Sequence, residues 1–431
     1  MLGSAASMSI LDDLAWRGQL YQSTDLEQLK QHLATGSRSL YCGFDPTKDS
    51  LGIGNLVPML VLRRFQLAGH KPVVIMGGGT GLVGDPSGKD SERTLLTPET
   101  IERNVQSQRE SFERVLDFDG PNAARILNNY DWLKKLGFLE ALRDIGKHFS
   151  VNMMIQKDSV RERLQNREQG ISYTEFSYML LQAYDFAYLF KEHGVTMQVS
   201  GSDQWGNITA GIDLIRRLHH AEAYALTVPL IMKADGTKFG KTESGNIWLK
   251  AERTSPYALY QFFVNTADAD VPNFLKVLTL LERPVIEELL AEHERDPAAR
   301  VAHKALAAHV TELLHGKEGL ARAEETTAAL FSGEVAKLPR ETLDELFGNA
   351  PSAKLGKERL GGQGLDVVDL LVEGGVVKSK REAREFLASG AILINGEKAA
   401  PDQRLTQASL LHDEMLLIRR GKKNWHSVRF E

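Results

Sequence analysis

The chain has 431 residues, which is too long for one ordinary hydrophobic core and predicts two or three domains. Apolar residues make up 42% and charged residues 25%, as in globular proteins, and we find no run long and apolar enough to cross a bilayer. The single cysteine, Cys42, excludes an internal disulfide and a cysteine-cluster metal site. The net charge of −5 excludes a uniformly basic surface but allows a local basic patch. The N-terminal residues lack the pattern of an export signal, so we expect a cytoplasmic protein.

The N-terminal part of the chain alternates between strand-like and helix-like segments. SLYCGFD (39–45) predicts a buried strand, residues 55–68 a helix, and KPVVIMGG (71–78) the next strand. This order predicts a βαβ unit and therefore a parallel, doubly wound sheet, whose ligand site lies at the carboxyl ends of the strands. Residues 100–190 are predicted to be largely helical, and VTMQVSGSD (195–203) predicts another strand that runs into a loop.

Two glycine-containing turns follow the first strands, and they differ in what they predict. GTGLVG (79–84) matches the G-x-G-x-x-G pattern of dinucleotide-binding loops, but Asp85 and Pro86 interrupt the helix that should follow at once. We therefore do not expect a nicotinamide enzyme. Gly52 and Gly54 lie at the first βα turn, where a helix N-terminus attracts anions and the missing side chains admit a nucleotide. The alternative for this pair is a simple tight turn.

The segment KADGTKFGKTESG (233–245) carries three lysines, Lys233, Lys238 and Lys241, between its glycines. Ammonium groups on a mobile loop are suited to stabilise the charge of a phosphate group during its transfer. GDPSGKDS (84–91) does not have P-loop spacing, so the chemistry predicted here is nucleotidyl transfer by positioned charges. The alternative is an exposed basic loop.

The remainder of the chain is predicted to contain a helical region and a small terminal domain. Residues 250–330 are rich in Ala, Leu and Glu, whereas residues 348–364 are glycine-rich without periodicity and predict a linker. Residues 365–431 carry 11 Lys plus Arg and 10 Asp plus Glu, a net charge of +1, and combine short helices with strands.

The basic residues of this terminal segment gather in two clusters, which are either a solvated face or a surface for a phosphate backbone. The clusters consist of Lys378, Lys380, Arg381 and Arg384, and of Arg419, Arg420, Lys422 and Lys423. The small domain and its two clusters favour nucleic-acid contact. The predicted domain bounds are 1–232 for the catalytic domain, 233–347 for the lysine loop and helical domain, 348–364 for the linker and 365–431 for the terminal domain.

Taken together, these residues resemble bacterial tyrosyl-tRNA synthetase, a family of class I aminoacyl-tRNA synthetases. The resemblance extends from LAWRG near residue 14 to the terminal RRGKK. The motifs YCGFDPT, GDPSGK, NNYDW, GKHFSVN, ISYTEFSYMLLQAYDF, GSDQWGNITAG and KADGTKFGKTESG occur in family order. The family implies a Rossmann-type catalytic domain, a helical anticodon-binding domain, a small α+β S4-like RNA-binding domain and a homodimer. The implied partners are L-tyrosine, ATP with Mg²⁺, and tRNA(Tyr), with no membrane and no tightly bound cofactor or protein metal site.

The resemblance implies a tyrosine pocket formed by Tyr41, Asp85, Asn129, Tyr178, Gln182, Asp185 and Gln198. Tyr41 and Asp185 match the pair that binds the tyrosine hydroxyl, and such a pair rejects phenylalanine because its buried groups would lose their partner. Tyr178, Gln182 and Asp85 match the residues that hold the α-amino group, while Asn129 and Gln198 match supporting residues. Tyr178, Gln182 and Asp185 are spaced so that they share one face of a helix.

The resemblance also implies the nucleotide site and the catalytic groups. The ATP-binding positions are Gly43, Asp45, Gly54, Gly201, Asp203, Gln204 and Lys241. The positions implied in catalysis are Thr47, Gly52, Asn55, Lys89, Arg93, Lys238, Lys241 and Thr242. Lys89 and Arg93 match cations of a mobile loop, and KFGKT matches the family's Lys-Met-Ser-Lys-Ser signature. The implied reaction needs no general base, because positioning and charge carry the catalysis.

Two positions depart from the family pattern. Gly52 stands where the family has the first histidine of its His-Ile-Gly-His or His-Ile-Gly-Asn signature, and Ser200 stands where it usually has glycine. Loss of one donor to the developing phosphate charge costs about 2.7–4 kcal/mol by analogy with oxyanion holes. Three interpretations follow from Gly52: a working synthetase that tolerates it, an attenuated synthetase that still binds tyrosine and ATP, and a non-catalytic RNA-binding paralogue. Ser200 is either a harmless exchange or a residue that crowds the ribose site.

Overall fold

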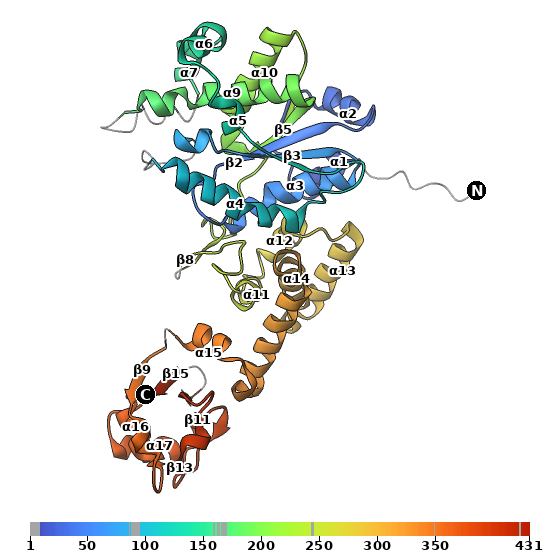
Figure 1. Cartoon of the computed structure of the whole chain (residues 1–431). Coiled ribbons are helices and arrows are strands. Elements are labelled where there is room, and N and C mark those ends of the chain that lie inside the picture. Colours follow the sequence, from blue (N-terminus) through green and yellow to red (C-terminus); the bar gives the residue numbers. More distant parts are fainter. Residues whose placement is uncertain are drawn as a thin grey trace, which may run out of the picture. The chain divides into compact units, whose positions relative to one another are not determined.

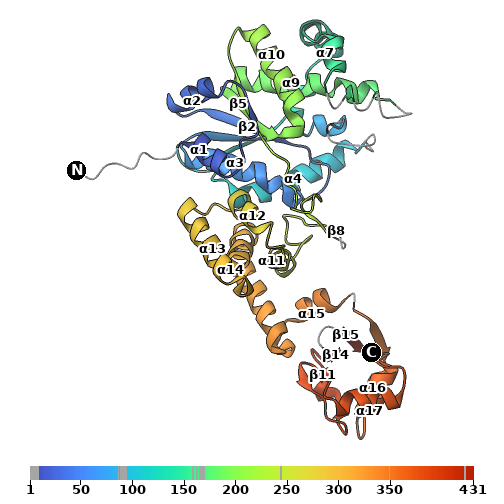
Figure 2. The ribbon, with the colours of Figure 1, turned by 180° about the vertical axis from the view of Figure 1, so that it is seen from behind.

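The computed structural model describes most of the chain, and the chain divides into two compact units, Met1–Gly319 and Leu320–Glu431. The residues that it describes are 9–85, 87, 95–157, 160–161, 164, 170–242, 245–348, 350–421 and 424–431. None of the helices in these ranges is long and apolar enough to span a bilayer. Both units appear in Figure 1 and, from behind, in Figure 2.

The first unit is built on a six-stranded sheet. Its strand order is β1 (Gln22–Ser23), β6 (Tyr224–Val228), β5 (Val195–Gly201), β2 (Ser39–Phe44), β3 (Lys71–Met76) and β4 (Arg125–Asn128). All neighbouring strands are parallel except β1, which runs antiparallel to β6. The chain leaves β2 on the β3 side and returns on the β5 side, so the strand order reverses between β2 and β5. The predicted doubly wound parallel sheet is confirmed, and ligands bind such sheets at this reversal.

Helices cover both faces of this sheet (Figure 1 and Figure 2). One face carries α1 (Ile10–Trp16), α3 (Leu56–Leu67) and α4 (Pro98–Val115); the other carries α9 (Tyr173–His193) and α10 (Trp205–His219). The described part of the first unit before α11 also contains the α-helices α2 (Leu26–Ala34), α5 (Tyr130–Leu133), α6 (Phe138–Glu140) and α7 (Val151–Ile155).

Helix α9 carries several predicted site residues, and its position has a local cause. Ser172 caps its first turn by accepting a hydrogen bond from the Glu175 amide, and Gly194 ends it in the left-handed conformation with φ 65°. Phe186 on the inner face of α9 packs into the same core cluster as Tyr41 on β2 and Val73 on β3. The polar residues of α9 are therefore held against the carboxyl ends of the central strands.

The helices that follow the sheet are α11 (Pro256–Val264), α12 (Val271–Leu278), α13 (Arg283–Arg295) and α14 (Val301–Ser332), which confirms the predicted helical region. Helix α14 is kinked at Gly316, whose φ of 75° and ψ of 175° are not helical. Short strands β7 (Lys241–Thr242) and β8 (Gly245–Asn246) form a hairpin before α11.

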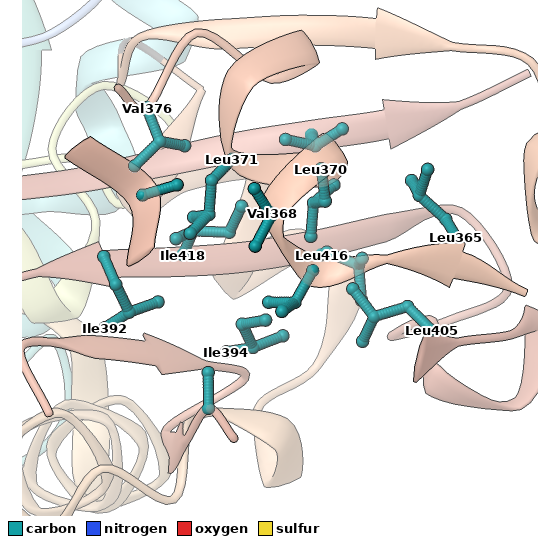
Figure 3. Packing of buried hydrophobic residues seen from close by; sticks show 14 of the residues in the cluster. Leu365, Val368, Leu370, Leu371, Val376, Ile392, Ile394, Leu405, Leu416 and Ile418 are labelled. Carbon is teal, nitrogen blue, oxygen red and sulfur yellow. The ribbon is translucent and has the colours of Figure 1, made fainter. Parts of the chain in front are cut away.

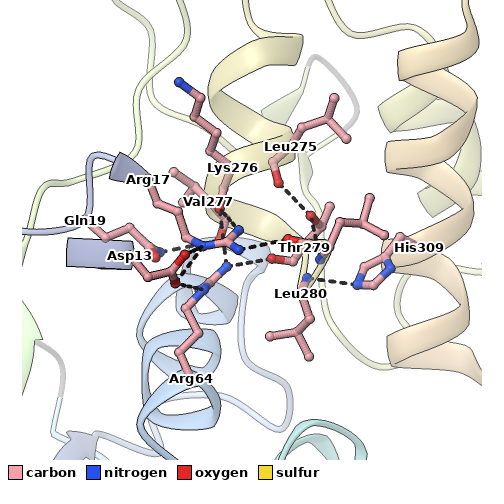
Figure 4. A network of polar contacts seen from close by, with 11 residues as sticks. Asp13, Arg17, Gln19, Arg64, Leu275, Lys276, Val277, Thr279, Leu280 and His309 are labelled. Atoms are coloured by element: carbon pink, nitrogen blue, oxygen red, sulfur yellow. Dashed lines mark hydrogen bonds and ion pairs between the residues drawn. The ribbon is translucent and has the colours of Figure 1, made fainter. Parts of the chain in front are cut away.

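Two buried arginines tie this helical region to α1 and α3 (Figure 4). Arg64 of α3 donates a hydrogen bond of 2.6 Å to the Thr279 carbonyl, and Arg17 donates one of 2.9 Å to the Lys276 carbonyl. The Asp13 carboxylate lies 2.9 Å from Arg17 and 3.9 Å from Arg64. Burial lowers the pKa of Arg64 to about 9. These bonds satisfy the orphan carbonyls at the end of α12 and fix α3 against the helical region.

The second unit contains a five-stranded sheet in the order β12 (Glu397–Lys398), β11 (Ile392–Ile394), β14 (Met415–Arg420), β15 (Asn424–Phe430) and β9 (Ser352–Leu355). Strands β10 (Leu365–Asp366) and β13 (Arg404–Leu405) form a separate, antiparallel two-stranded sheet. Helices α15 (Arg340–Phe347), α16 (Val367–Glu373) and α17 (Lys380–Ala388) complete the unit. Figure 3 shows the core formed by residues such as Leu370, Ile392 and Leu416. The predicted small α+β domain is confirmed.

The predicted linker over 348–364 is wrong for most of its length. Strand β9 pairs in parallel with β15, from Ser352 opposite Ser427 to Leu355 opposite Phe430, and Leu360 is buried in the core. The strand has only four residues, which alternate between exposed and half-buried positions. Such a short alternation is not recognisable in a segment that contains five glycines. The segment therefore belongs to the folded second unit.

Candidate functional site

A cavity of about 640 Å³ opens at the carboxyl ends of β2 and β5, where the strand order reverses. Segments far apart in the chain meet there: the end of β2, the start of α3, the middle of α9, the end of β5 and the segment 238–248. The predicted site residues that line it are Tyr41, Gly43, Asp45, Thr47, Gly52, Gly54, Asn55, Asp85, Asn129, Tyr178, Gln182, Asp185, Gln198, Gly201, Asp203, Gln204, Lys238 and Lys241. The structure thus brings these predicted residues together around one cavity, and their individual roles stay predictions.

Asp185 of α9 forms the buried carboxylate of this cavity. Its Oδ1 accepts a hydrogen bond of 2.7 Å from Trp132 Nε1, and its Oδ2 accepts one of 2.8 Å from Asn129 Nδ2. Burial raises the pKa of Asp185 to about 7, and these two donors only partly oppose the effect. Each oxygen keeps acceptor capacity beyond its one partner, so Asp185 is a fixed acceptor with room for a ligand donor.

Tyr41 of β2 and Gln198 of β5 face the same cavity with unmet hydrogen-bonding capacity. Tyr41 is 2% exposed, and its hydroxyl has no hydrogen-bond partner among the described residues. The same holds for Gln198 Oε1. Burial, and next the charge of Asp185, raise the pKa of Tyr41 well above its usual value, so the hydroxyl stays protonated. An orphaned buried hydroxyl costs free energy that a polar ligand can recover.

A second layer of hydrogen bonds fixes Asp45 at the end of β2. Its carboxylate accepts a hydrogen bond of 3.2 Å from the Tyr178 hydroxyl and one of 2.9 Å from Thr80 Oγ1. Gly77 must lack a side chain here, because a Cβ at this position would overlap Asp45. Thr80 lies in the GTGLVG motif, after which no helix opens at once in the described residues. One residue of this dinucleotide-like pattern, Thr80, therefore helps to hold Asp45 in place.

A further chain of polar side chains extends from Asp85 along the start of α10. Gln204 Nε2 donates a hydrogen bond of 2.6 Å to Asp85 and one of 3.0 Å to Asp203. Asn207 Nδ2 then donates 3.1 Å to Gln182 and 3.1 Å to Gln204. This network presents two carboxylates to the cavity, and carboxylates are the expected complement of an ammonium group.

Gly52 and its neighbours form the opposite wall. Gly52 pairs with Trp248 in an isolated bridge, and Asn55 Nδ2 donates 3.2 Å to the Gly52 carbonyl. Asn55 caps α3 without a side-chain bond to the helix amides. A Cβ added to Gly52 would meet only the Ile247 carbonyl, at the ordinary distance of 3.8 Å. The backbone therefore has room for a side chain at residue 52.

The lysine loop packs directly on this wall. Gly240, with φ 81°, lies so close to Ile53 that a Cβ would stand 2.5 Å from the Ile53 methyl group. Phe239 is buried against Phe274, 4.7 Å between ring centroids, and fixes the loop to α12. Lys238 and Lys241 are exposed and line the cavity. Two cations thus border the end of the cavity that Gly52 and Gly54 leave open.

Some predicted residues lie elsewhere. Thr242 does not line the cavity; its hydroxyl donates 2.9 Å to the Gly245 carbonyl. Lys89, Arg93, Lys422 and Lys423 lie outside the described residues, so their predicted roles stay predictions.

Ser200, which is paired with Thr227 in the sheet, does line the cavity, and its backbone φ is not positive.

Three residues that the sequence analysis missed support the site: Trp132, Thr80 and Asn207. Trp132 stacks on Tyr188, 4.7 Å between ring centroids, which holds its indole toward Asp185. The available signal was its position in NNYDW, three residues after Asn129. Thr80 and Asn207 lie in the motifs GTGLVG and GSDQWGNITAG, but the spacing of a motif does not predict where these side chains point.

Among the described residues of the two predicted basic clusters, Arg420 connects the second cluster to the helix that carries most of the first. Arg420 at the end of β14 lies over the Phe386 ring of α17, 5.5 Å from its centroid, and donates 2.8 Å to the Val376 carbonyl. Several members are already ion-paired: Lys380 with Asp369 at 2.6 Å and Arg381 with Glu385 at 3.0 Å. Lys378 and Arg384 are exposed, whereas Arg419 is half-buried over Trp425. Arg420 therefore lies on the face of β14 that meets α17, whereas Arg419 lies on the opposite face, and ion pairs neutralise part of the charge of the first cluster.

Comparison with protein families places this fold and cavity in a known class. A family model described as "tRNA synthetases class I (W and Y)" matches residues 34–332, and a model described as "Tyrosine--tRNA ligase SYY-like C-terminal domain" matches residues 342–428. The first match covers more than half of the chain. The chain therefore belongs to the class I tRNA synthetases.

Individual proteins narrow this class. The chain is 49% identical over 424 residues to the tyrosine--tRNA ligase of Staphylococcus carnosus, covering 98% of this chain and 99% of that protein. It is 50% identical over 426 residues to that of Geobacillus kaustophilus, covering 98% and 100%. Within its class, it is a member of the tyrosine--tRNA ligases.

Solved structures agree with this assignment. A C-terminally truncated mitochondrial tyrosyl-tRNA synthetase of Aspergillus nidulans is 30% identical, with a TM-score of 0.69 over 76% of this chain and 95% of that chain. A tyrosyl-tRNA synthetase of Archaeoglobus fulgidus complexed with L-tyrosine has a TM-score of 0.55 over 72% of this chain and 100% of that chain. At 18% identity, the second likeness concerns the fold alone.

Proposed function

We propose that this tyrosine--tRNA ligase activates L-tyrosine with ATP to give tyrosyl-adenylate and pyrophosphate, and then transfers the tyrosyl group to tRNA(Tyr). The observation that carries the choice of amino acid is the buried pair at one end of the cavity. The Tyr41 hydroxyl has no partner among the described residues, and the Asp185 carboxylate is fixed by Trp132 and Asn129. A phenolic hydroxyl between them donates to Asp185 and accepts from Tyr41.

Rejection of phenylalanine follows from the same pair. Phenylalanine has the same ring but no hydroxyl, so it would leave Tyr41 orphaned and keep Asp185 desolvated without a new partner. Tyrosyl-tRNA synthetases are themselves the known example of discrimination by such unpaired groups. At the other end of the amino acid, Asp85, Tyr178 and Gln182 hold the α-amino group, supported by the bonds that Gln204 and Asn207 make with them.

ATP occupies the remainder of the cavity as its Mg²⁺ salt. The residues proposed to contact it are Gly43, Asp45, Gly54, Gly201, Asp203, Gln204 and Lys241. Glycines at these backbone turns admit the nucleotide closely, and the N-terminus of α3 favours its phosphates. The protein needs no tightly bound cofactor for this reaction.

Activation joins a carboxylate oxygen of tyrosine to the α-phosphorus. That bond forms as the bond between the α-phosphorus and the bridging oxygen breaks, and pyrophosphate leaves with the electron pair. No proton has to be removed from the attacking carboxylate, so positioning and charge carry the step. Lys238 and Lys241, which border the cavity, stabilise the departing charge, assisted by Thr47 and Asn55. The family resemblance adds Lys89 and Arg93 to this set.

Gly52 lowers the rate of this step in our proposal, because a donor to the phosphates is missing at the start of α3. The test is tyrosine-dependent ATP–pyrophosphate exchange by this chain and by its Gly52→His variant, with tyrosine affinity measured in parallel. We expect histidine to raise the exchange rate by about 100-fold, since one such donor is worth about 2.7–4 kcal/mol. The affinity for tyrosine should stay the same.

The other outcomes are equally informative. Equal exchange rates for the two forms would mean that another group, such as Asn55 or Thr47, already supplies the donor. Exchange by neither form would overturn the catalytic proposal and favour an RNA-binding paralogue, the alternative that Gly52 raises. Gly54→His is the matched control, because the same side chain at the neighbouring glycine should obstruct ATP and abolish exchange.

We also propose a homodimer. Phe138 and Leu139 of α6 are 69% and 79% exposed, and Val151 and Met153 of α7 are 56% and 59% exposed. Such a gathering of apolar side chains marks an interaction surface. A second copy of this chain is its partner. A Phe138→Asp, Leu139→Asp variant should sediment as a monomer at micromolar concentration, whereas Phe331→Asp, at an exposed position of the second unit, should leave the dimer intact.

The second unit contributes tRNA binding in this proposal. Ending the chain at Ser332 should abolish tyrosylation of tRNA(Tyr) and leave ATP–pyrophosphate exchange nearly unchanged. The cut must precede β9, because that strand and Leu360 belong to the second core. Equal loss of both activities would contradict a separate tRNA-binding role. A cytoplasmic location, where tRNA is charged, completes the proposal.

A further inference from the structure

Outside the cavity, two histidines and one carboxylate converge in the helical region. His303 Nε2, at the start of α14, lies 3.1 Å from Asp268 Oδ1, and His293 Nε2, near the end of α13, lies 3.8 Å from the same oxygen. The three candidate ligand atoms all lie within 4.8 Å of one another. Both rings are buried, with His293 at 8% and His303 at 0% exposure, and their centroids are 5.0 Å apart.

Hydrogen bonding alone serves this cluster poorly. His303 Nε2 faces the Thr266 carbonyl at 3.1 Å as well as Asp268, yet a ring nitrogen carries only one proton to donate. Nδ1 of both histidines has no partner among the described residues, so no hydrogen bond at Nδ1 fixes the tautomer of either ring. A ring proton on Nδ1 leaves the lone pair of Nε2, the nitrogen that lies near Asp268, able to bind a metal ion.

We propose that Asp268, His293 and His303 bind one divalent transition-metal ion, with Zn²⁺ as the preferred ion. Two imidazoles and one carboxylate are a recurrent zinc ligand set, and the fourth position goes to water because Asp268 is 61% exposed. Arg300 opposes binding, since its Nη1 lies 3.8 Å from Asp268. Its other nitrogens, however, are committed to the carbonyls of Val264 and Thr266.

An ion at this site would join three elements: α13, α14 and the turn between α11 and α12. The same turn contains Asp270, whose carboxylate accepts 2.6 Å from the Ala234 amide at the base of the lysine loop. The ion is therefore a structural clamp under the loop that carries Lys238 and Lys241. It takes no part in the chemical step, and the inference does not depend on the proposed function.

The test is metal binding by the full chain after treatment with a chelator. Co²⁺ is titrated by visible absorption, and Zn²⁺ is measured by its displacement of Co²⁺ and by Tm. We expect one ion per chain, with the Co²⁺ bands of a site that contains imidazole, and a Tm that rises with Zn²⁺ concentration. Asp268→Asn and His303→Gln should each weaken binding by at least about 10–100-fold, the loss known even for residues that only support metal ligands.

His220→Asn is the matched control, because His220 is exposed and its left-handed backbone suits asparagine. This variant should bind the ion as the original chain does. Unchanged binding by Asp268→Asn, loss of binding in His220→Asn, or no binding by the original chain would each overturn the proposal. Asp268→Asn decides the question if His303→Gln fails to fold, because an exposed carboxylate can be replaced without disturbing the core.

Discussion

The two ends of the cavity differ in how much of the site is built before a ligand arrives. At one end Asp185 is buried and already holds two hydrogen bonds, with Tyr41 beside it. At the other end, Gly52 and Gly54 carry no side chain, and Lys238 and Lys241 are exposed. The Asp185 end, which we propose binds the amino acid (the amino-acid end), is preorganised for selection, whereas the Gly52 end, which we propose binds the phosphates (the phosphate end), consists of open backbone and solvated charge.

This difference has a physical reason. Discrimination between tyrosine and phenylalanine needs desolvated partners in fixed positions, since a polar group is costly to leave unpaired only when it is buried. Phosphate groups enter and leave with each turnover, so exposed cations at the border of the cavity serve them better than a closed pocket. Substitutions at the two ends should therefore affect different quantities, rate at one end and amino-acid affinity at the other.

The largest expected effect is at the phosphate end. Lys241→Ala should lower the rate of ATP–pyrophosphate exchange by about 100–1000-fold, the loss found when one donor to a transition-state charge is removed. Tyrosine affinity, measured by calorimetry, should change less than twofold. Lys233→Ala is the control, because Lys233 is on the same loop but does not line the cavity. A comparable loss in the control would show that total loop charge matters, not position.

Tyr41→Phe should produce opposite changes in affinity and stability. Loss of the hydroxyl should weaken tyrosine binding by about 10–100-fold, as expected for one hydrogen bond left unmade in a buried site. It should also stabilise the free protein by about 1 kcal/mol, because the buried hydroxyl has no partner among the described residues. Urea unfolding measures the second effect.

Tyr178→Phe is the contrasting variant, since its hydroxyl already donates to Asp45. It should destabilise the free protein. If both variants are destabilised equally, the idea that the Tyr41 hydroxyl is reserved for the ligand is wrong.

The amino-acid end should also titrate near neutral pH. Burial raises the pKa of Asp185 to about 7, so the carboxylate takes up a proton as the pH falls below 7 and loses acceptor capacity. Tyrosine affinity should therefore decrease below pH 7, by at most about tenfold per pH unit for one proton. Binding at pH 6 should release a proton, which calorimetry in buffers of different ionisation enthalpy detects. Asp185→Asn should lack this dependence; a variant that kept it would place the titrating group elsewhere.

The smallest expected effect is at Ser200. Its backbone is ordinary strand, so the side chain imposes no strain. Ser200→Gly should change the KM for ATP by less than about twofold and destabilise the protein by about 0.5–1 kcal/mol, as glycine does within strands. A large fall in this KM would instead mean that serine crowds the ribose.

The sequence predicted the sheet because local patterns carry that information, whereas the predicted cavity residues came from the resemblance of its motifs to a known family. The βαβ alternation around Gly52 predicts where the strands end, and parallel strands end at one edge. The supporting residues were less accessible. Trp132 and Asp185, which form a hydrogen bond, are 53 residues apart in the sequence. No periodicity of the sequence predicts the direction of the Trp132 indole. Strand β9 was missed because its partner, β15, lies more than 70 residues later.

By itself, the sequence determined the order of strands and helices, the motifs whose family resemblance implies the cavity residues, and the absence of an imidazole at residue 52. Each of these depends on local spacing, on a short motif or on the identity of one residue. Only the tertiary structure decided that the Tyr41 hydroxyl lacks a partner among the described residues, that Asp185 is held by Trp132, and that Asp268 meets two histidines. Hydrogen bonding and burial depend on which distant segments pack together, and packing is a property of the whole fold.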